Sequence, residues 1–179
     1  MSDTANAYAQ ALYALGAEEN KTECFLQQLT ALQESFETEP AFYRLLTTHS
    51  LSKEERCQIL DDGFRGKVEP YVLNFLKLLT EKGRIRLFSD CCRAYCAQYD
   101  KDNGILRAAA VTAVALTKEQ TEKLKDKLQT ITQKTVILSN RIDPTCLGGV
   151  RLEYDGICVD GTVENHLNNL RGLLAKTVL

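Results

Sequence analysis

The 179-residue chain carries little net charge and has no long apolar run. Its 22 Lys and Arg nearly balance its 24 Asp and Glu, for a formal net charge of −2. This balance gives no electrostatic reason to bind nucleic acid or an anionic membrane surface. No apolar segment reaches the ~20 residues that span a bilayer. The N-terminus MSDTANAYAQ has no basic stretch followed by an apolar run. We therefore expect no secretory signal, no direct membrane insertion and no nucleic-acid partner.

The spacings that catalytic and metal sites use are also missing. There is no Cys-x-x-Cys, and His49 and His166 stand apart from the cysteines, whereas a structural zinc needs four ligands with short paired spacings. The LGGV segment at 147–150 is not followed by Lys-Ser or Lys-Thr, so a tight turn before a strand explains it better than a phosphate loop. No Ser/His/Asp or Cys/His set has the turn context of a nucleophile. The sequence predicts no catalytic residues, no cofactor and no metal.

Seven cysteines are more than a chain of this length needs. The odd number and the absence of a signal peptide argue against a disulfide framework. Reduced thiols that pack as small core residues explain most of them. Cys91, Cys92 and Cys96 form a local cluster, but Cys92 and Cys96 share a helix face with Phe88 and Tyr95, where core residues belong. A thiol-redox or metal protein built on this cluster remains an alternative.

Residues 68–88 are the most apolar segment and organise the N-terminal half. At 100° per residue, their apolar side chains cover an arc of about 160°, which Leu73 widens to about 220°. An ordinary surface helix shows a stripe of little more than ~100°. The helix, which Pro70 opens and Gly83 ends, therefore lies in the middle of a bundle or leaves surface for a partner. The residues of the arc are Val68, Tyr71, Val72, Phe75, Leu76, Leu78 and Leu79.

The first helix, predicted over residues 3–17, has two useful faces. Tyr8, Leu12 and Leu15 form a large apolar stripe at helical spacing, which core packing explains. A second face consists of small residues at i, i+4 and i+7, and small side chains let another helix come close. That face is a candidate docking surface and consists of Ala7, Ala11 and Ala14.

Four further helices complete the N-terminal half. Asn20 and Glu23 predict a cap pair before a helix that buries Phe25, and Ser52 and Glu55 form a capping box. Another helix begins at Pro40, and the last runs over 84–102. The turn signal Asn103-Gly104 closes what we predict as a six-helix bundle over residues 1–104.

Residues 105–179 have a different character. Small and β-branched side chains over 105–115 predict a strand. Thr117 and Gln120 then form a capping box at the predicted start of a helix. A second strand covers 135–139. Val150 to Tyr154 alternate as a half-buried strand does, and the Asp155-Gly156 turn returns the chain through Ile157 and Val159. A last helix begins near Gly161-Thr162, is capped by Asp160, and buries Val163, Leu167, Leu170 and Leu174. The fold class is α+β, a helical bundle followed by a small α/β domain with a short mixed sheet and two helices.

Four segments, in order and spacing, resemble one family over nearly the whole chain. They are Tyr8-Ala9-x-Ala11-Leu12-Tyr13-x-Leu15; Lys82-Gly83-Arg84-Ile85; Val111-Thr112-Ala113 leading to Leu116-Thr117-x-x-Gln120; and Asp143-Pro144-x-x-Leu147-Gly148-Gly149-Val150 through to Asp160-Gly161-Thr162-Val163-x-x-x-Leu167. The set resembles the delta subunit family of bacterial F-type ATP synthase, relatives of the mitochondrial oligomycin-sensitivity-conferring protein. Each segment is weak singly, and the ordered set is specific.

The resemblance implies a non-catalytic stator subunit on the cytoplasmic face of the bacterial cell membrane. The domain over 1–104 would hold the N-terminal helix of an alpha subunit of the catalytic head, and the domain over 105–179 would hold the b subunits of the peripheral stalk. The family groove lies between the first and fifth helices, here 3–17 and 68–82. The expected groove residues are Tyr8, Ala11, Leu12, Leu15, Val72, Phe75, Leu76 and Leu79.

The chain departs from the family at several charged positions. Ala7 and Gln10 stand where the family often has basic residues, and Glu164, Asn165 and His166 stand in a region that is often arginine-rich. A charge-based account of partner recognition therefore does not carry over. A generic helical adaptor outside the synthase is the alternative function.

Overall fold

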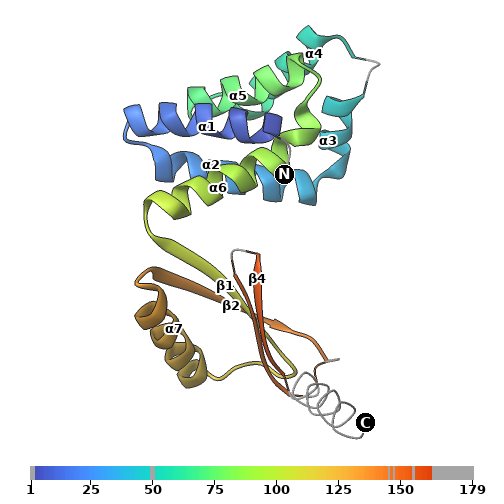
Figure 1. Ribbon diagram of the computed structural model, residues 1–179. Helices are drawn as coiled ribbons and strands as arrows, with labels where there is room; N and C mark the ends of the chain where they lie inside the picture. Colours follow the sequence, from blue (N-terminus) through green and yellow to red (C-terminus); the bar gives the residue numbers. More distant parts are fainter. Residues whose placement is uncertain (1–2, 49–50, 145, 147, 155, 163–179) are drawn as a thin grey trace, which may run out of the picture. The chain divides into compact units, whose positions relative to one another are not determined.

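The computed structural model describes residues 3–48, 51–144, 146, 148–154 and 156–162. These residues form a mixed α+β structure with seven α-helices and a four-stranded sheet. The chain divides into two compact units, the first ending at Tyr99 and the second beginning at Asp100 (Figure 1). The division falls inside the last helix of the N-terminal half, and each unit is described separately below.

The first unit is helical. Its elements are α1 (Asp3–Glu18), α2 (Thr22–Thr38), α3 (Pro40–Thr47), α4 (Lys53–Phe64), α5 (Pro70–Glu81), the 3₁₀ turn η1 (Ile85–Leu87) and α6 (Phe88–Asp102), whose last residues belong to the second unit. Pro70 opens α5 as predicted. Gly83 adopts φ +65 after its end, a conformation that glycine reaches without a side-chain clash.

Side-chain caps define some of these ends and not others. The predicted capping box at α4 is confirmed, because Ser52 Oγ accepts from Glu55 N at 3.1 Å and Glu55 Oε2 accepts from Ser52 N at 2.8 Å. The predicted cap pair at α2 is wrong. Asn20 takes a left-handed φ of 55 and ends α1 instead, since its N–H donates to Ala17 O and that of Lys21 donates to Gly16 O.

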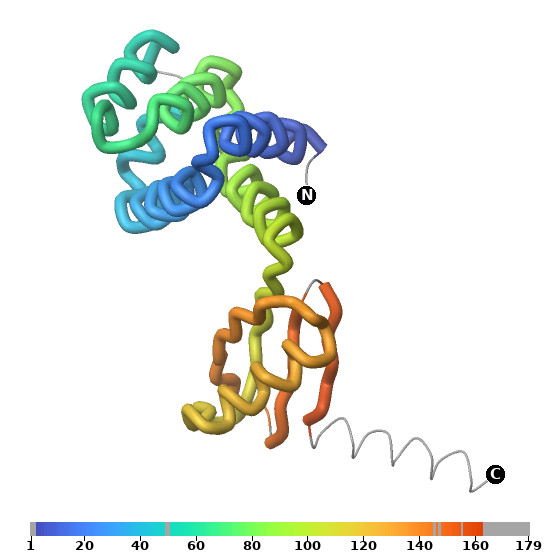
Figure 2. The backbone as a smooth tube through the Cα atoms, turned by 90° about the vertical axis from the view of Figure 1, so that its left-hand side faces the viewer, coloured from blue at the N-terminus to red at the C-terminus, as the bar shows by residue number. Residues whose placement is uncertain are grey.

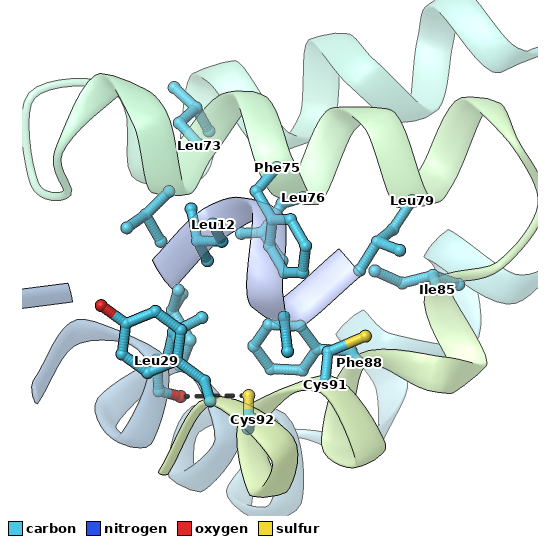
Figure 3. Packing of buried hydrophobic residues seen from close by; sticks show 14 of the residues in the cluster. Leu12, Leu29, Leu73, Phe75, Leu76, Leu79, Ile85, Phe88, Cys91 and Cys92 are labelled. Carbon is cyan, nitrogen blue, oxygen red and sulfur yellow. Dashed lines mark hydrogen bonds between the residues drawn. The ribbon is translucent and has the colours of Figure 1, made fainter. Parts of the chain in front are cut away.

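The helix α5 lies at the centre of the core of this unit. It packs against α1, α2, α4 and η1. Phe75, Leu76 and Leu79 point toward the space that α1 and α6 share, whereas Leu73 points the other way (Figure 3). Burial on several sides accounts for the breadth of its apolar surface. Thr80 is buried as well, and its hydroxyl donates to Leu76 O of the same helix at 2.9 Å.

Aromatic rings fill the part of the core between α2, α3, α4 and α6. Phe36 of α2 contacts Phe42 at a centroid distance of 6.0 Å, Phe64 at 6.3 Å and Phe88 at 5.2 Å. These are ordinary separations for offset and edge-to-face aromatic pairs. They join four helices through one side chain.

The second unit contains a mixed sheet with strand order β2-β1-β3-β4. The strands are β1 (Ile105–Thr112), β2 (Thr135–Ile142), β3 (Gly149–Tyr154) and β4 (Ile157–Thr162). β1 pairs in parallel with β2, and α7 (Lys118–Thr132) connects them; β3 is antiparallel to both β1 and β4. The predicted mixed sheet, the capping box of Thr117 and Gln120 and the hairpin strands are confirmed.

One face of this sheet packs against α7, through Leu106, Ala108, Val136 and Leu128 (Figures 1 and 2). Close strand contact at the start of β3 requires glycine, because a Cβ at Gly149 would lie 2.5 Å from the carbonyl oxygen of Gly161.

Two strand boundaries differ from the prediction. β1 ends at Thr112, three residues before 115, and β2 continues to Ile142. The predicted helix start at Gly161-Thr162 is wrong, because both residues belong to β4 and pair with β3. The last helix itself, with Val163, Leu167, Leu170 and Leu174, lies outside the described residues, as do Asp155, Leu147 and both histidines.

Candidate partner-binding face

The helices α1 and α5 pack side by side in antiparallel orientation (Figure 1). Polar contacts join them at both ends. Tyr71, at the start of α5, donates its hydroxyl to Glu19 Oε1 at 3.1 Å, just after the end of α1. Arg84, after the end of α5, donates Nη1 to the Tyr8 hydroxyl at 3.3 Å. The hydrogen bond to Glu19, together with the negative charge of that carboxylate, raises the pKa of Tyr71. These contacts fix the position of α1 relative to α5, and with it the relative position of the exposed side chains of the two helices.

The structure places the eight predicted groove residues in three different environments. Five are buried in the core, so they support the face from below and present almost no surface: Leu12, Val72, Phe75, Leu76 and Leu79. Tyr8 is half-buried, with Arg84 against its ring. Ala11 and Leu15 are exposed, and the side chain of Leu15 is 40% accessible.

Two exposed apolar residues of α5 extend this surface. Tyr71 is 36% exposed and Leu78 is 40% exposed, at positions i and i+7 of the helix. Neither was among the expected groove residues, although both belong to the wide apolar arc of this segment. We name the α1–α5 face as Tyr8, Ala11, Leu15, Tyr71 and Leu78. The flanking residues Ala7 and Ala14 are exposed beside it on α1.

Two larger cavities lie elsewhere in the described structure. One of about 710 Å³ is lined by residues of α2, α3 and α4, with Phe36, Phe42 and Phe64 among them. Another of about 620 Å³ lies on the sheet of the second unit, where Arg107, Glu153 and Cys158 are among its lining residues. Neither includes a residue of the α1–α5 face.

The cysteine cluster has the properties of core packing. All seven thiols are free. Cys91 and Cys92 are buried, and burial raises the pKa of Cys91 to about 11 and that of Cys92 to about 12. Cys92 Sγ lies 3.9 Å from Leu29 O, to which it donates (Figure 3). Nucleophilic or redox-active cysteines need an accessible thiolate at neutral pH, so this environment opposes the thiol-redox alternative.

No group of three or more His, Cys, Asp or Glu within the described ranges has the arrangement to hold a metal ion. Two carboxylates of the second unit are paired with the same arginine. Arg151 contacts Glu153 at 3.2 Å and Asp143 at 3.8 Å.

None of the helices in the described part of the chain is both long and apolar enough to span a bilayer.

Comparison with known proteins identifies relatives along nearly the full chain. The family model described as ATP synthase delta (OSCP) subunit matches residues 4–174. The chain is 32% identical over 172 residues to ATP synthase subunit delta of Alkaliphilus oremlandii, covering 96% of each protein. It is 31% identical over 175 residues to ATP synthase subunit delta of Clostridioides difficile, covering 97% of each.

A solved structure has the same fold. It is a chain in the cryo-EM structure of the Toxoplasma gondii mitochondrial ATP synthase hexamer, with a TM-score of 0.80 and 18% sequence identity. The match covers 97% of this chain and 98% of that one. At this identity the likeness concerns the fold, and it includes both units.

Proposed function

Because the chain belongs to the ATP synthase delta (OSCP) subunit family, we propose that it is a non-catalytic stator subunit of an F-type ATP synthase. In this role it links the alpha subunits of the catalytic head to the b subunits of the peripheral stalk. Rotation of the central shaft exerts torque on the head, and a tether that resists this torque couples rotation to ATP synthesis and proton transport. Such a tether needs binding surfaces and no catalytic group.

We assign the contact with the head to the α1–α5 face of the helical unit, taken as a six-helix bundle over residues 1–104. A helix that docks on a helical surface uses apolar anchors at i, i+3, i+4 and i+7. Leu15, Tyr71 and Leu78 offer exposed apolar contact area, and the alanines of α1 let a partner backbone come close. One observation carries the assignment: these apolar side chains are exposed on two antiparallel helices that pack side by side. Its occupant is the N-terminal helix of an alpha subunit.

We assign the contact with the b subunits to the domain over residues 105–179, through its last helix and C-terminus. In this arrangement the protein lies on the cytoplasmic face of the bacterial cell membrane as a peripheral part of the complex. The generic-adaptor alternative would be favoured by a pull-down from the native membrane fraction that recovers neither alpha nor b subunits.

The test of the head contact is titration of the full chain with a synthetic peptide of the alpha-subunit N-terminus from the same organism. Ala11→Arg places a long charged side chain on the face, where Ala11 is exposed and its loss removes no core contact. We expect at least about a tenfold loss of affinity, the scale of one disrupted central contact, with unchanged helicity by circular dichroism.

Ala31→Arg is the matched control, because Ala31 is also an exposed helical alanine but lies on α2. It should bind the peptide like the unmodified chain. If Ala11→Arg keeps both its helicity and full peptide affinity, the α1–α5 face is not the docking site.

A further inference from the structure

A small basic cleft lies where α3, α4 and the turn after α5 meet. Its volume is about 340 Å³. Lys53 and Arg56 of α4 line it together with Lys82 and Arg86, which flank the turn at Gly83, and one carboxylate, that of Glu81. Four cations and one anion surround this cleft in a chain whose net charge is −2.

Within the part of the chain that the structure describes, none of these four cations forms an ion pair. Elsewhere the common arrangement is different: Lys21 pairs with Glu69 at 3.0 Å and Lys77 pairs with Asp61 at 2.6 Å. Arg56 is instead positioned by carbonyl groups, with Nε 3.3 Å from Ser52 O and Nη1 3.3 Å from Leu46 O. A guanidinium has five N–H donors, so most of those of Arg56 remain available to a ligand.

The single carboxylate lies at the border of the cleft. Cys57 Sγ of α4 donates to Glu81 Oε1 at 4.0 Å. Glu81 also lines a neighbouring hollow, where Glu54 brings a second carboxylate beside Lys53 and Lys82. A long acidic peptide that ran on from the cleft would meet as many carboxylates as lysines in this hollow, so the added length would gain no net attraction there. A compact anion that stays within the basic cleft avoids this hollow.

We propose that this cleft binds a small phosphate-bearing anion, of which pyrophosphate and the diphosphate of a nucleotide are the two sources. Guanidinium groups match the geometry of phosphate oxygens and bind them through paired hydrogen bonds. The volume of 340 Å³ suits a compact ligand, since pockets for small molecules begin at about 300 Å³. This binding site is separate from the α1–α5 face and adds a ligand to a protein otherwise built to hold other subunits.

The experiment is calorimetric titration of the full chain with pyrophosphate, and separately with ADP, both without added metal. The double variant Lys82→Gln/Arg86→Gln removes two exposed cations of the cleft, neither of which forms an ion pair with a described residue. The control Arg65→Gln/Lys127→Gln makes the same change in net charge at two exposed positions outside the cleft.

We expect the cleft variant to bind pyrophosphate about tenfold more weakly, as the loss of two solvent-screened charge contacts predicts, and the control to bind like the unmodified chain. Binding of pyrophosphate and ADP with this pattern indicates a nucleotide site, and binding of pyrophosphate alone indicates an inorganic one. Equal affinities of the two variants would overturn the proposal. So would capture of a hexaglutamate peptide by the unmodified chain in the absence of any pyrophosphate or ADP binding.

Discussion

The guanidinium of Arg84 lies over the ring of Tyr8, with its Cζ 6.0 Å from the ring centroid and its Nη1 3.3 Å from the hydroxyl. The two residues are 76 positions apart in sequence. The contact joins the chain after α5 to the first half of α1, at one border of the proposed docking face. It therefore couples the stability of the unit to the geometry of that face.

This contact predicts a measurable coupling energy. In a double-mutant cycle of Tyr8→Leu and Arg84→Met, we expect about 0.5–1 kcal/mol, the usual value for an exposed cation–π pair. The measurement is the free energy of unfolding in urea for the four proteins. Tyr8→Phe, which keeps the ring and loses the hydroxyl, should retain most of the coupling; strictly additive effects of Tyr8→Leu and Arg84→Met would show that the pair does not interact.

Leu76 and Leu78 of α5 predict different effects of the same substitution, the first on stability and the second on peptide binding. Leu76 is 0% exposed, so Leu76→Ala should lower the free energy of unfolding by about 2–5 kcal/mol. Leu78 is 40% exposed, and Leu78→Ala should cost less than about 1 kcal/mol. Leu78→Ala should nevertheless weaken binding of the alpha peptide. Urea denaturation followed by peptide titration separates the two effects, and a Leu78→Ala protein that unfolds as easily as Leu76→Ala would contradict the assignment.

Cys92 predicts a loss of stability at alkaline pH. Burial raises the pKa of its thiol from 9.0 to about 12 in the folded protein. The stability from the neutral buried thiol is therefore fully present below pH 9, and it is lost as pH rises from there toward 12. Between pH 8 and pH 10 we expect a loss of about 1 kcal/mol from this group. The measurement is the free energy of unfolding at several pH values.

Cys92→Ala should flatten this alkaline decline, whereas Cys158→Ala, at an exposed position, should leave it unchanged. An identical pH dependence in the unmodified chain and in Cys92→Ala would show that the thiol does not contribute. Cys91 and Tyr95 are also buried groups with a raised pKa, so some decline should persist in Cys92→Ala.

Gly149, at the start of β3, and Gly156, in the turn before β4, predict different costs for the same substitution. Both have positive φ, 88 and 77, so alanine is strained at either position by about 1–2 kcal/mol. At Gly156 a Cβ meets nothing within 4 Å, whereas at Gly149 it lies 2.5 Å from Gly161 O. Gly149→Ala should therefore cost at least about 1 kcal/mol more than Gly156→Ala. Thermal unfolding of the two variants measures the difference, and equal midpoints would contradict the steric cost predicted at Gly149.

Periodicity and cap patterns predicted the helices and strands well, because local physics determines them. The apolar arc of residues 68–88 predicted a central helix, and this is confirmed because α5 packs against neighbours on several sides. The predicted capping boxes at Ser52 and Thr117 are present in the structure, because each depends only on two residues three positions apart. The prediction that Asn20 caps the start of α2 was wrong for a physical reason. Asparagine suits both the start of a helix and the left-handed residue after the end of one, and only the preceding helix decides between them.

The candidate face was harder to predict from the sequence. Leu78 and Leu79 are adjacent and equally apolar, yet Leu78 is exposed and Leu79 is buried. Which of them faces solvent depends on which helices pack beside α5, and a single helix wheel does not contain that information. For the same reason, five of the eight expected groove residues are core residues of the unit. The basic cleft cannot be predicted from the sequence, because its cations come from two segments, near 53–56 and 82–86, that become neighbours only in the folded chain.

The buried hydroxyl of Thr80 has a consequence for how the helices of this unit pack. Its hydrogen bond to Leu76 O lies within one helix, so no adjacent helix has to hold an acceptor at a fixed place. The side chains that surround Thr80 can therefore be chosen for shape and apolar contact alone, and the polar contacts of α5 with its neighbours lie at other positions, such as Lys77 with Asp61.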